Sequence, residues 1–189
     1  MTQERNLLVA AKGQEKLSEW LSAICVGEIV VATGAAQARR RANGDLFTVA
    51  LINAPLQDES GLELATDLAR NTTAAVVLLV KAEAAAMIAD AAMEAGVLIV
   101  TKPVNQLLFE QTIKLGIACR NRLLIYKEQT AKLQTRYEEL KIIDRAKCLL
   151  IEHMRITEEE AHRVLEKEAM DSRMSRVRVA KKVLEKFEL

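Results

Sequence analysis

The stretch "ALINAPLQDESGLELA", residues 50–65, joins the end of an apolar run to the start of an amphipathic helix. The run, "LFTVALIN" (46–53), is rich in aliphatic and β-branched residues, as is typical of a buried strand. It ends at Asn53, and a polar loop leads from there to Gly61 and the helical pattern of residues 61–70. This order of strand, loop and helix is the unit from which the first part of the chain is predicted to be built.

The same unit recurs on both sides of this stretch. The other predicted strands are "NLLVAA" (6–11), "EIVVAT" (28–33), "AAVVLLV" (74–80) and "VLIVT" (97–101). The segments between the strands are predicted as helices over residues 14–25, 34–44 and 83–96. Strands that are apolar throughout, each followed by a helix, indicate a parallel sheet covered on both faces. We therefore expect a flavodoxin-like, doubly wound α/β domain of five strands, with functional groups at their carboxyl ends.

Composition excludes several classes of protein. The 189 residues are 50% hydrophobic and 28% charged, and the formal net charge of +1 points to no particular partner. The three cysteines lie far apart and indicate neither a disulfide framework nor a zinc site, so we expect no metal and no cofactor. Because no signal-peptide pattern begins the chain and no apolar run reaches about 18 residues, we expect a cytoplasmic protein without membrane association.

The motifs "PLQDESG" (55–61) and "TKPV" (101–104) resemble those of a response-regulator receiver domain. In that family two acidic residues hold Mg²⁺, an aspartate accepts a phosphoryl group, a hydroxyl senses it, and the lysine of a Lys-Pro pair neutralises its oxygens. The resemblance places Ala10 and Ala11 at the acidic pair, Asn53 at the acceptor, Lys81 at the hydroxyl position and Lys102 at the lysine. Only Lys102 keeps the family's residue type, so the resemblance implies a degenerate receiver, or pseudoreceiver. In this family the peptide bond before the proline of the Lys-Pro pair, here Pro103, is often cis.

Two questions about this pocket stay open in the sequence. Asp58 or Glu59 could replace the missing acceptor, but the loop position favours solvated, helix-capping carboxylates. Lys81 and Lys102 could form an electropositive pocket that holds an anion, but Lys81 is more simply explained if it points to solvent or pairs with a local carboxylate. A protein or small-ligand regulator at this domain is compatible with either answer.

A single long helix is predicted to follow, because helix-favouring residues continue from Val104 to about Met154, with no Gly or Pro after Gly116. Apolar residues recur along it at spacings of four and three, which is a heptad seam with one polar interruption at Thr130. The predicted seam consists of Cys119, Leu123, Tyr126, Leu133, Tyr137 and Leu140. We favour a parallel coiled-coil homodimer over a seam that packs on its own chain, because an isolated helix would expose this stripe.

The last fifty residues are predicted to form a small bundle of three short helices. Thr157 and Glu160 form a capping box that starts the second helix, and Ser175 is a plausible N-cap for the third. The second helix is expected to bury Ala161, Val164, Leu165 and Ala169, and the third Val177, Ala180, Val183, Leu184 and Phe187.

The motifs of this bundle resemble the ANTAR domain, the AmiR/NasR-type antiterminator module that binds RNA. The matching segments are residues 145–151, "TEEEAHRVLEKEAMDSR" (157–173) and "VAKKVL" (179–184). Together with the receiver-like part, the resemblance divides the chain into a pseudoreceiver (1–118), a coiled-coil linker (119–140) and an ANTAR domain (141–189). It implies a transcription antitermination regulator that binds tandem hairpins in an mRNA leader.

Basic residues support this expectation, since residues 172–189 hold six basic and two acidic side chains. The residues expected to contact RNA are Arg145, Lys147, His162, Arg163, Arg173, Arg176 and Lys181. A charge run of this kind can also be a solvated helix face. A protein-interaction scaffold in a signalling complex is therefore kept as the alternative, with duplex DNA binding third. An enzyme is least favoured, because no nucleophile–base pair or glycine-rich phosphate loop is present.

Overall fold

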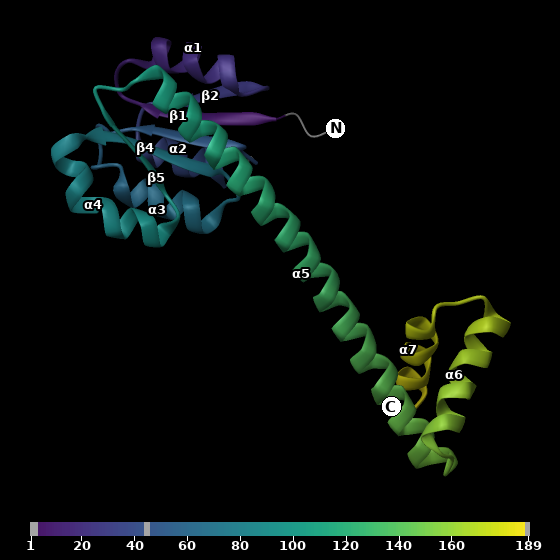
Figure 1. Cartoon of the computed structure of the whole chain (residues 1–189). Helices are drawn as coiled ribbons and strands as arrows, with labels where there is room; N and C mark the ends of the chain where they lie inside the picture. The colour runs from purple at the N-terminus through teal and green to yellow at the C-terminus, as the bar shows by residue number, and fades with distance from the viewer. Residues whose placement is uncertain (1–3, 44–45, 188–189) are drawn as a thin grey trace. The chain divides into compact units, whose positions relative to one another are not determined.

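The computed structural model of the chain describes residues 4–43 and 46–187 and separates into two compact units, Met1–Ile125 and Tyr126–Leu189. The strands of the first unit are β1 (Arg5–Ala10), β2 (Glu28–Ala32), β3 (Val49–Asn53), β4 (Ala75–Lys81) and β5 (Leu98–Lys102). They form one parallel sheet in the order β2-β1-β3-β4-β5 (Figure 1). This is the flavodoxin-like order, so the predicted fold class is confirmed.

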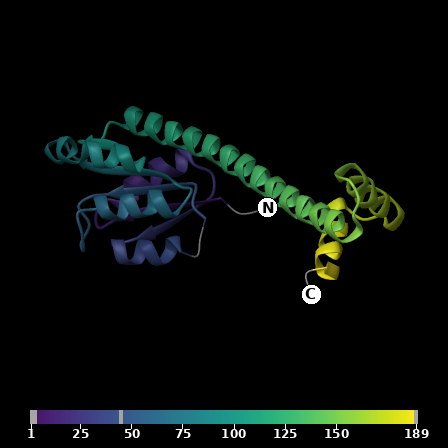
Figure 2. The same cartoon turned by 90° about the horizontal axis from the view of Figure 1, so that it is seen from below.

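Helices cover both faces of this sheet (Figures 1 and 2). They are α1 (Gln14–Ile24), α2 (Ala35–Ala42), α3 (Leu62–Asn71), α4 (Ala82–Ala95) and the first part of α5 (Gln106–Met154). One core packs α1 and α5 on the sheet, with the rings of Trp20 and Phe109 5.6 Å apart. A second core packs α2, α3 and α4 on the opposite face. Neighbouring residues of one strand, such as Ile52 and Leu51 of β3, enter different cores, which explains why the strands are apolar throughout.

The boundaries of some elements differ from those predicted. The third strand begins at Val49 rather than at residue 46, because Val49 is the first residue aligned with both β1 and β4. Helix α4 follows β4 directly, so Lys81 both ends the strand and occupies the N-cap position of the helix. Gly44, the predicted end of the second helix, lies outside the described residues. The Lys102–Pro103 peptide bond is cis, as the resemblance implied, and so is Ala54–Pro55.

Gly116 lies inside α5 without interrupting it. A Cβ atom at this position would lie 3.0 Å from Cδ1 of Leu98 and 3.1 Å from Cβ of Ala75. The helix therefore approaches the sheet more closely here than a larger residue would allow.

The second unit contains the end of α5, α6 (Glu158–Ser172) and α7 (Arg176–Phe187). Their shared core includes Ala146 and Leu150 of α5, Leu165 of α6, and Val179 and Ala180 of α7. The capping box is confirmed: Thr157 accepts from the backbone N–H of Glu160, and the Glu160 carboxylate accepts from that of Thr157. Ser175 Oγ accepts from the backbone N–H of Arg178 at 3.4 Å.

Two expectations about this core were wrong. Val164 is 38% exposed, because Ala161, Leu165 and Ala169 recur every four residues and the stripe they form covers only a narrow face of α6. On α7 the fully covered residues are Val179 and Ala180, whereas Val177 is only half-buried at its first turn. Among the described residues, every helix lacks the long apolar stretch that crossing a membrane requires.

Candidate functional site

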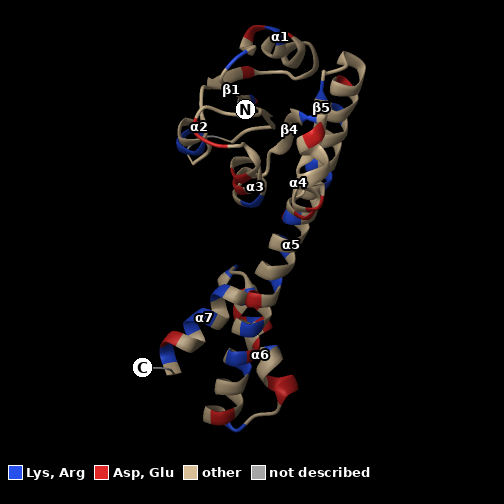
Figure 3. Ribbon diagram, turned by 90° about the vertical axis from the view of Figure 1, so that its left-hand side faces the viewer, with Lys and Arg blue, Asp and Glu red and all other residues tan. Residues whose placement is uncertain are grey.

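The two short helices of the second unit carry opposite charge. Helix α6 contains six acidic residues against two of Lys or Arg, whereas α7 contains five basic residues against one acidic residue. Figure 3 shows several blue segments along α7 and one red segment near its end. An anionic polymer is therefore attracted to α7 and repelled by much of α6.

The basic residues of α7 gather on the side that faces away from the core. Arg178, Lys181 and Lys182 recur at spacings of three and four, so they share one helical face. They line an open groove of about 590 Å³ with Ser175, Glu185 and, from α5, Glu139. Within the described part of the chain none of these three cations forms an ion pair. The groove thus offers three unpaired positive charges to an anionic partner.

The seven predicted RNA-binding residues differ in their exposure and in their interaction partners. Lys181 lines this groove, and Arg173 is exposed at the C-terminal end of α6. His162 and Arg176 both approach Glu166 at 3.3 Å, and Arg163 approaches Glu159 at 3.9 Å. Arg145 is exposed on α5 and also has an interaction partner.

Lys147 is the most strongly engaged of the seven. Its ammonium lies 2.8 Å from Asp144 and 3.1 Å from Glu158, and its side chain is 16% exposed. Hydrogen bonds to Asp144 and then Glu158 raise the pKa of Lys147 above its ordinary value. The residue therefore ties α5 to the first turn of α6, a role that spacing along the sequence did not reveal.

Phe187, which is expected to be buried, lies at the end of α7. The ring of Phe187 stacks on His153 at the end of α5, with centroids 4.7 Å apart and planes at 17°. Phe187 also packs against the core of the bundle, which confirms the assignment. The groove residues are therefore equipped for phosphate contacts rather than for stacking.

In the first unit, Asn53 ends β3 directly beside Ala10 of β1. Its amide donates to the carbonyl of Lys12 at 2.9 Å, so it holds the loop that follows β1. Ala10 is fully buried and Ala11 half-buried, and neither carries a metal-binding group. At the ends of β4 and β5, Lys81 is exposed and Lys102 is half-buried. The five positions assigned to the degenerate pocket thus share the carboxyl edge of the sheet.

Asp58 and Glu59 both act as structural anchors in the loop after β3. The Asp58 carboxylate accepts from the backbone N–H groups of Ala35 and Ala36 at 2.9 and 3.0 Å and so caps α2. Glu59 accepts from Leu64 N–H at the start of α3 and pairs with Arg39, each at 2.8 Å. The capping interpretation is therefore supported for both carboxylates.

Across residues 4–43 and 46–187, no group of His, Cys, Asp and Glu forms a metal site.

Comparisons with known proteins agree with both units. Residues 131–184 match the family model of the ANTAR domain. Similar solved structures include an adenylate cyclase from Rhodopirellula baltica, with 19% identity and a TM-score of 0.58 over 69% of this chain and 98% of the other. They also include the signal receiver domain of an HD domain-containing protein from Pseudomonas fluorescens Pf-5, with 17% identity and a TM-score of 0.57 over 65% and 92%.

A response regulator receiver domain protein from Clostridium thermocellum is similar at 20% identity, with a TM-score of 0.55 over 64% of this chain and 98% of the other. No curated protein matches the chain.

The chain therefore has a receiver plus ANTAR architecture. The structural similarities establish the receiver fold, while the ANTAR match implies an RNA-binding antitermination regulator. Such an architecture is typical of a regulator rather than an enzyme.

The ANTAR domain includes most of the basic groove, since Glu139, Arg178, Lys181 and Lys182 lie within its matched residues. Lys181 is one of the seven residues expected to contact RNA, whereas Arg178 and Lys182 are not among them. The signal that would have found them is the spacing of three and four that all three cations share on one face of α7.

Proposed function

We propose that the protein binds tandem hairpins in nascent mRNA through the α7 face of its ANTAR domain, disfavours a terminator and so lets transcription proceed. The observation that carries this proposal is the set of unpaired cations on the outward face of α7. RNA hairpins present phosphates that such cations neutralise, while unpaired loop bases supply the sequence signal. Acidic α6 keeps the RNA on the α7 side.

The residue assignment follows from this geometry. Arg178 and Lys182 join Lys181 as phosphate contacts on α7, with Arg173 beside the turn that leads to it. Lys147 and Arg176 instead join helices of the bundle through Glu158 and Glu166. His162 and Arg163 pair with acids one turn away on α6 itself, and Arg145 remains an expected RNA contact on α5. These assignments rest on charge and exposure.

The receiver-like domain acts without phosphoryl transfer in this proposal. Asn53 occupies the end of β3, and its amide is held by the Lys12 carbonyl. Ala10 and Ala11 provide no oxygen ligand for Mg²⁺. The domain therefore serves for dimerisation, or for docking a protein or small-ligand regulator. We propose the division 1–118, 119–140 and 141–189 for the pseudoreceiver, linker and ANTAR domain, and cytoplasmic action on nascent mRNA.

The middle of α5 supports a parallel homodimer. Every residue from 125 to 141 is exposed, although the stretch contains large apolar side chains. Leu123, Tyr126, Leu133, Tyr137 and Leu140 of the proposed seam are between 51% and 65% exposed, and Cys119 is exposed as well. A second copy of the helix would cover this seam by knobs-into-holes packing.

The test is a mobility shift of the full-length protein on tandem RNA hairpins and on a scrambled control, with and without acetyl phosphate and Mg²⁺. We expect binding to the hairpins that is specific and unchanged by the phosphodonor. A need for the phosphodonor would refute the proposed role of the receiver. Failure to bind any hairpin in such a panel would refute RNA recognition.

A protein-interaction scaffold is the second candidate, favoured by the surface of α4. Met87 and Met93 are 87% and 73% exposed there, and Ala92 is the one buried residue of this described helix. Salt distinguishes the two functions, because binding that neutralises phosphates weakens steeply as salt rises. Preference for duplex DNA over hairpins would support the third candidate instead.

A further inference from the structure

The residues that border the seam of α5 are basic or neutral. In a two-stranded coil these flanking residues, at the e and g positions of each heptad, face the other helix and set which partner it accepts. Seven flanking positions accompany the seam, and two of them are glutamines. The other five are Arg120, Arg122, Lys127, Arg136 and Lys141. The acids of this stretch take outer positions instead, at Glu128, Glu138 and Glu139.

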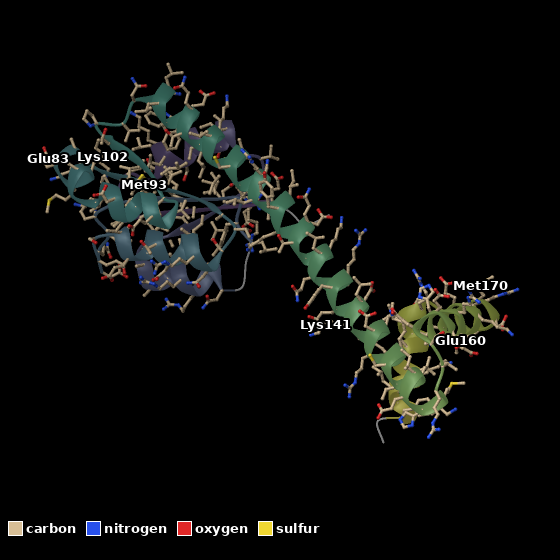
Figure 4. All side chains as sticks on the ribbon, turned by 60° about the horizontal axis from the view of Figure 1, so that its bottom comes forward. Glu83, Met93, Lys102, Lys141, Glu160 and Met170 are labelled. Atoms are coloured by element: carbon tan, nitrogen blue, oxygen red, sulfur yellow. The ribbon has the colours of Figure 1, made fainter. Side chains whose placement is uncertain are left out.

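Most of the flanking cations are available to a partner helix. Lys127, Arg136 and Lys141 are exposed, and side chains project freely from this part of α5, where Figure 4 labels Lys141. In the described part of the chain, Lys127 and Arg136 form no ion pair. Lys141 approaches Glu138 of its own helix only at 3.9 Å, and Arg122 is exposed but has an interaction partner.

A second copy of α5 would cover the apolar seam but would not match its charge. In a parallel pair each g residue faces the e residue of the next heptad on the other helix. Arg122 of one copy then meets Lys127 of the other, and Arg136 meets Lys141. Twofold symmetry repeats both contacts. In an antiparallel pair e faces e and g faces g, so cations meet cations there too. The homodimer is therefore weaker than its seam alone would make it.

We propose that the seam of α5 also binds a helix of another protein, with an apolar seam of its own and acidic flanking residues. Such a helix covers the same stripe and replaces each like-charge contact by an attractive one. Charge complementarity thus selects it over a second copy. A protein helix fits better than RNA, because a phosphate backbone would leave the apolar stripe exposed.

The consequence for regulation rests on the proposed function. A helix that occupies the seam excludes the second copy and so keeps two ANTAR domains from acting together. Because tandem hairpins gain affinity from two linked domains, the partner would lower the affinity for RNA. The seam of α5 would then be the place where another protein controls the regulator.

The test titrates the full-length protein with three synthetic peptides that copy residues 117–143. The first carries glutamate in place of the five flanking cations, and the second has the native sequence and stands in for a second copy. The third has the composition of the first, but its new glutamates exchange places with neutral residues at outer positions. At low salt we expect the first peptide to bind roughly tenfold or more tightly than the native peptide, with an advantage that shrinks as salt rises.

The third peptide should bind more weakly than the first, because its glutamates face away from the seam. Equal affinity of the first and second peptides, or of the first and third, would overturn the proposal. Fluorescence anisotropy of labelled peptides gives these affinities, and sedimentation shows whether each complex holds one peptide per chain.

Substitutions in the full-length protein locate the effect. Arg136→Glu should weaken binding of the first peptide roughly fivefold and strengthen binding of the native peptide. Lys132→Glu is the matched control, because Lys132 takes an outer position and pairs with Glu128 of its own helix at 2.6 Å. It makes the same change of charge and should leave the order of the peptides unchanged. An equal effect of the two substitutions would overturn the proposal.

Hairpin binding separates this inference from the proposed function. The expected order of peptides in a chain that binds no hairpin would support the inference and refute the proposed function. Loss of hairpin affinity in Arg136→Glu as large as in Lys181→Ala would show that the flanking cations contact RNA, and would overturn the choice of a protein partner.

Discussion

Single side chains at the sheet edge show how a receiver fold persists without its acidic pocket. Asn53 donates to the Lys12 carbonyl and Lys102 to the Ala54 carbonyl, while Gln14 donates to the Ala10 carbonyl at 2.6 Å. Each of these amide or ammonium groups thus donates one hydrogen bond to a backbone carbonyl near the sheet edge. These bonds fix the loops that Mg²⁺ and a phosphorylated aspartate organise in an active receiver.

The Asp58 carboxylate should make the stability of the first unit depend on pH. Hydrogen bonds from the backbone N–H groups of Ala35 and Ala36 hold the pKa of its carboxyl below the ordinary value. A lowered folded-state pKa means that the stabilisation is complete above the unfolded pKa of about 3.9 and is lost as pH falls through the folded value. We therefore expect wild type to be more stable than Asp58→Asn at neutral pH, with a difference that shrinks below about pH 4.

The measurement is thermal denaturation of the receiver-like domain within the full chain, from pH 7 to pH 3. Asp90→Asn on α4 is the control, because the Asp90 carboxylate is exposed and forms no hydrogen bond or ion pair with another described residue. A wild-type advantage over Asp58→Asn that is constant across this range would show that the carboxylate charge does not cap α2.

Gly34 leaves room for the contact between the Asp58 carboxylate and the start of α2. A Cβ atom there would lie 2.9 Å from both carboxylate oxygens of Asp58. Glycine thus lets the loop after β3 approach the first turn of α2, and this joins two elements that are distant in the sequence.

Among the elements, α6 depends on its first turn. Its capping box satisfies the Thr157 and Glu160 backbone N–H groups through each other's side chains. Thr157→Ala should destabilise the helix by about 1 kcal/mol, which corresponds to roughly fivefold faster hydrogen exchange of α6 amides.

Native-state hydrogen exchange of the full chain measures this effect directly. Thr135→Ala is the control, since Thr135 lies on exposed α5 and its hydroxyl bonds only the carbonyl one turn earlier. Unchanged exchange of α6 in Thr157→Ala would mean that tertiary packing alone sets the stability of the helix.

Local signals explain what the sequence could predict about these elements. The capping box and the end of α5 at Met154 follow from neighbouring residues, and both appear in the structure. Contacts between helices do not follow from such signals. Lys147 pairs with Glu158, and Arg176 with Glu166, only because three helices pack together. Two cations that were expected to contact RNA therefore form ion pairs within the bundle. Val164 was expected to be buried but is exposed for the same reason, because its exposure depends on how much of α6 contacts α5 and α7.

At the scale of the whole molecule, a parallel dimer would unite two ANTAR domains for two hairpins. Binding two linked hairpins with two linked domains raises the effective concentration of the second contact. The seam of α5 is thus connected to function through avidity as well as through stability.

Cysteine chemistry tests the direction of that dimer. In a parallel coiled coil, Cys119 of the seam faces Cys119 of the second copy, whereas Cys148 lies outside the seam. Mild oxidation should therefore give a disulfide-linked dimer that Cys119→Ser abolishes and Cys148→Ser leaves intact. Burial raises the pKa of the Cys25 thiol to about 11, so this cysteine should not take part.

A seam that packs on its own chain would give no such pattern. Equal cross-linking of Cys119→Ser and wild type would also contradict the parallel arrangement. Sedimentation of the oxidised and reduced protein shows whether the dimer exists before the disulfide forms.

RNA recognition by α7 is tested by the affinity for a tandem hairpin, measured at several salt concentrations for wild type and for the double variant Lys181→Ala, Lys182→Ala. Each lysine that neutralises a phosphate contributes about one unit to the slope of log affinity against log salt. If α7 binds RNA, the double variant should bind more weakly and with a slope shallower by about two units, whereas Lys167→Ala on acidic α6 should be close to wild type. Unchanged affinity and slope in the double variant would contradict RNA recognition by α7.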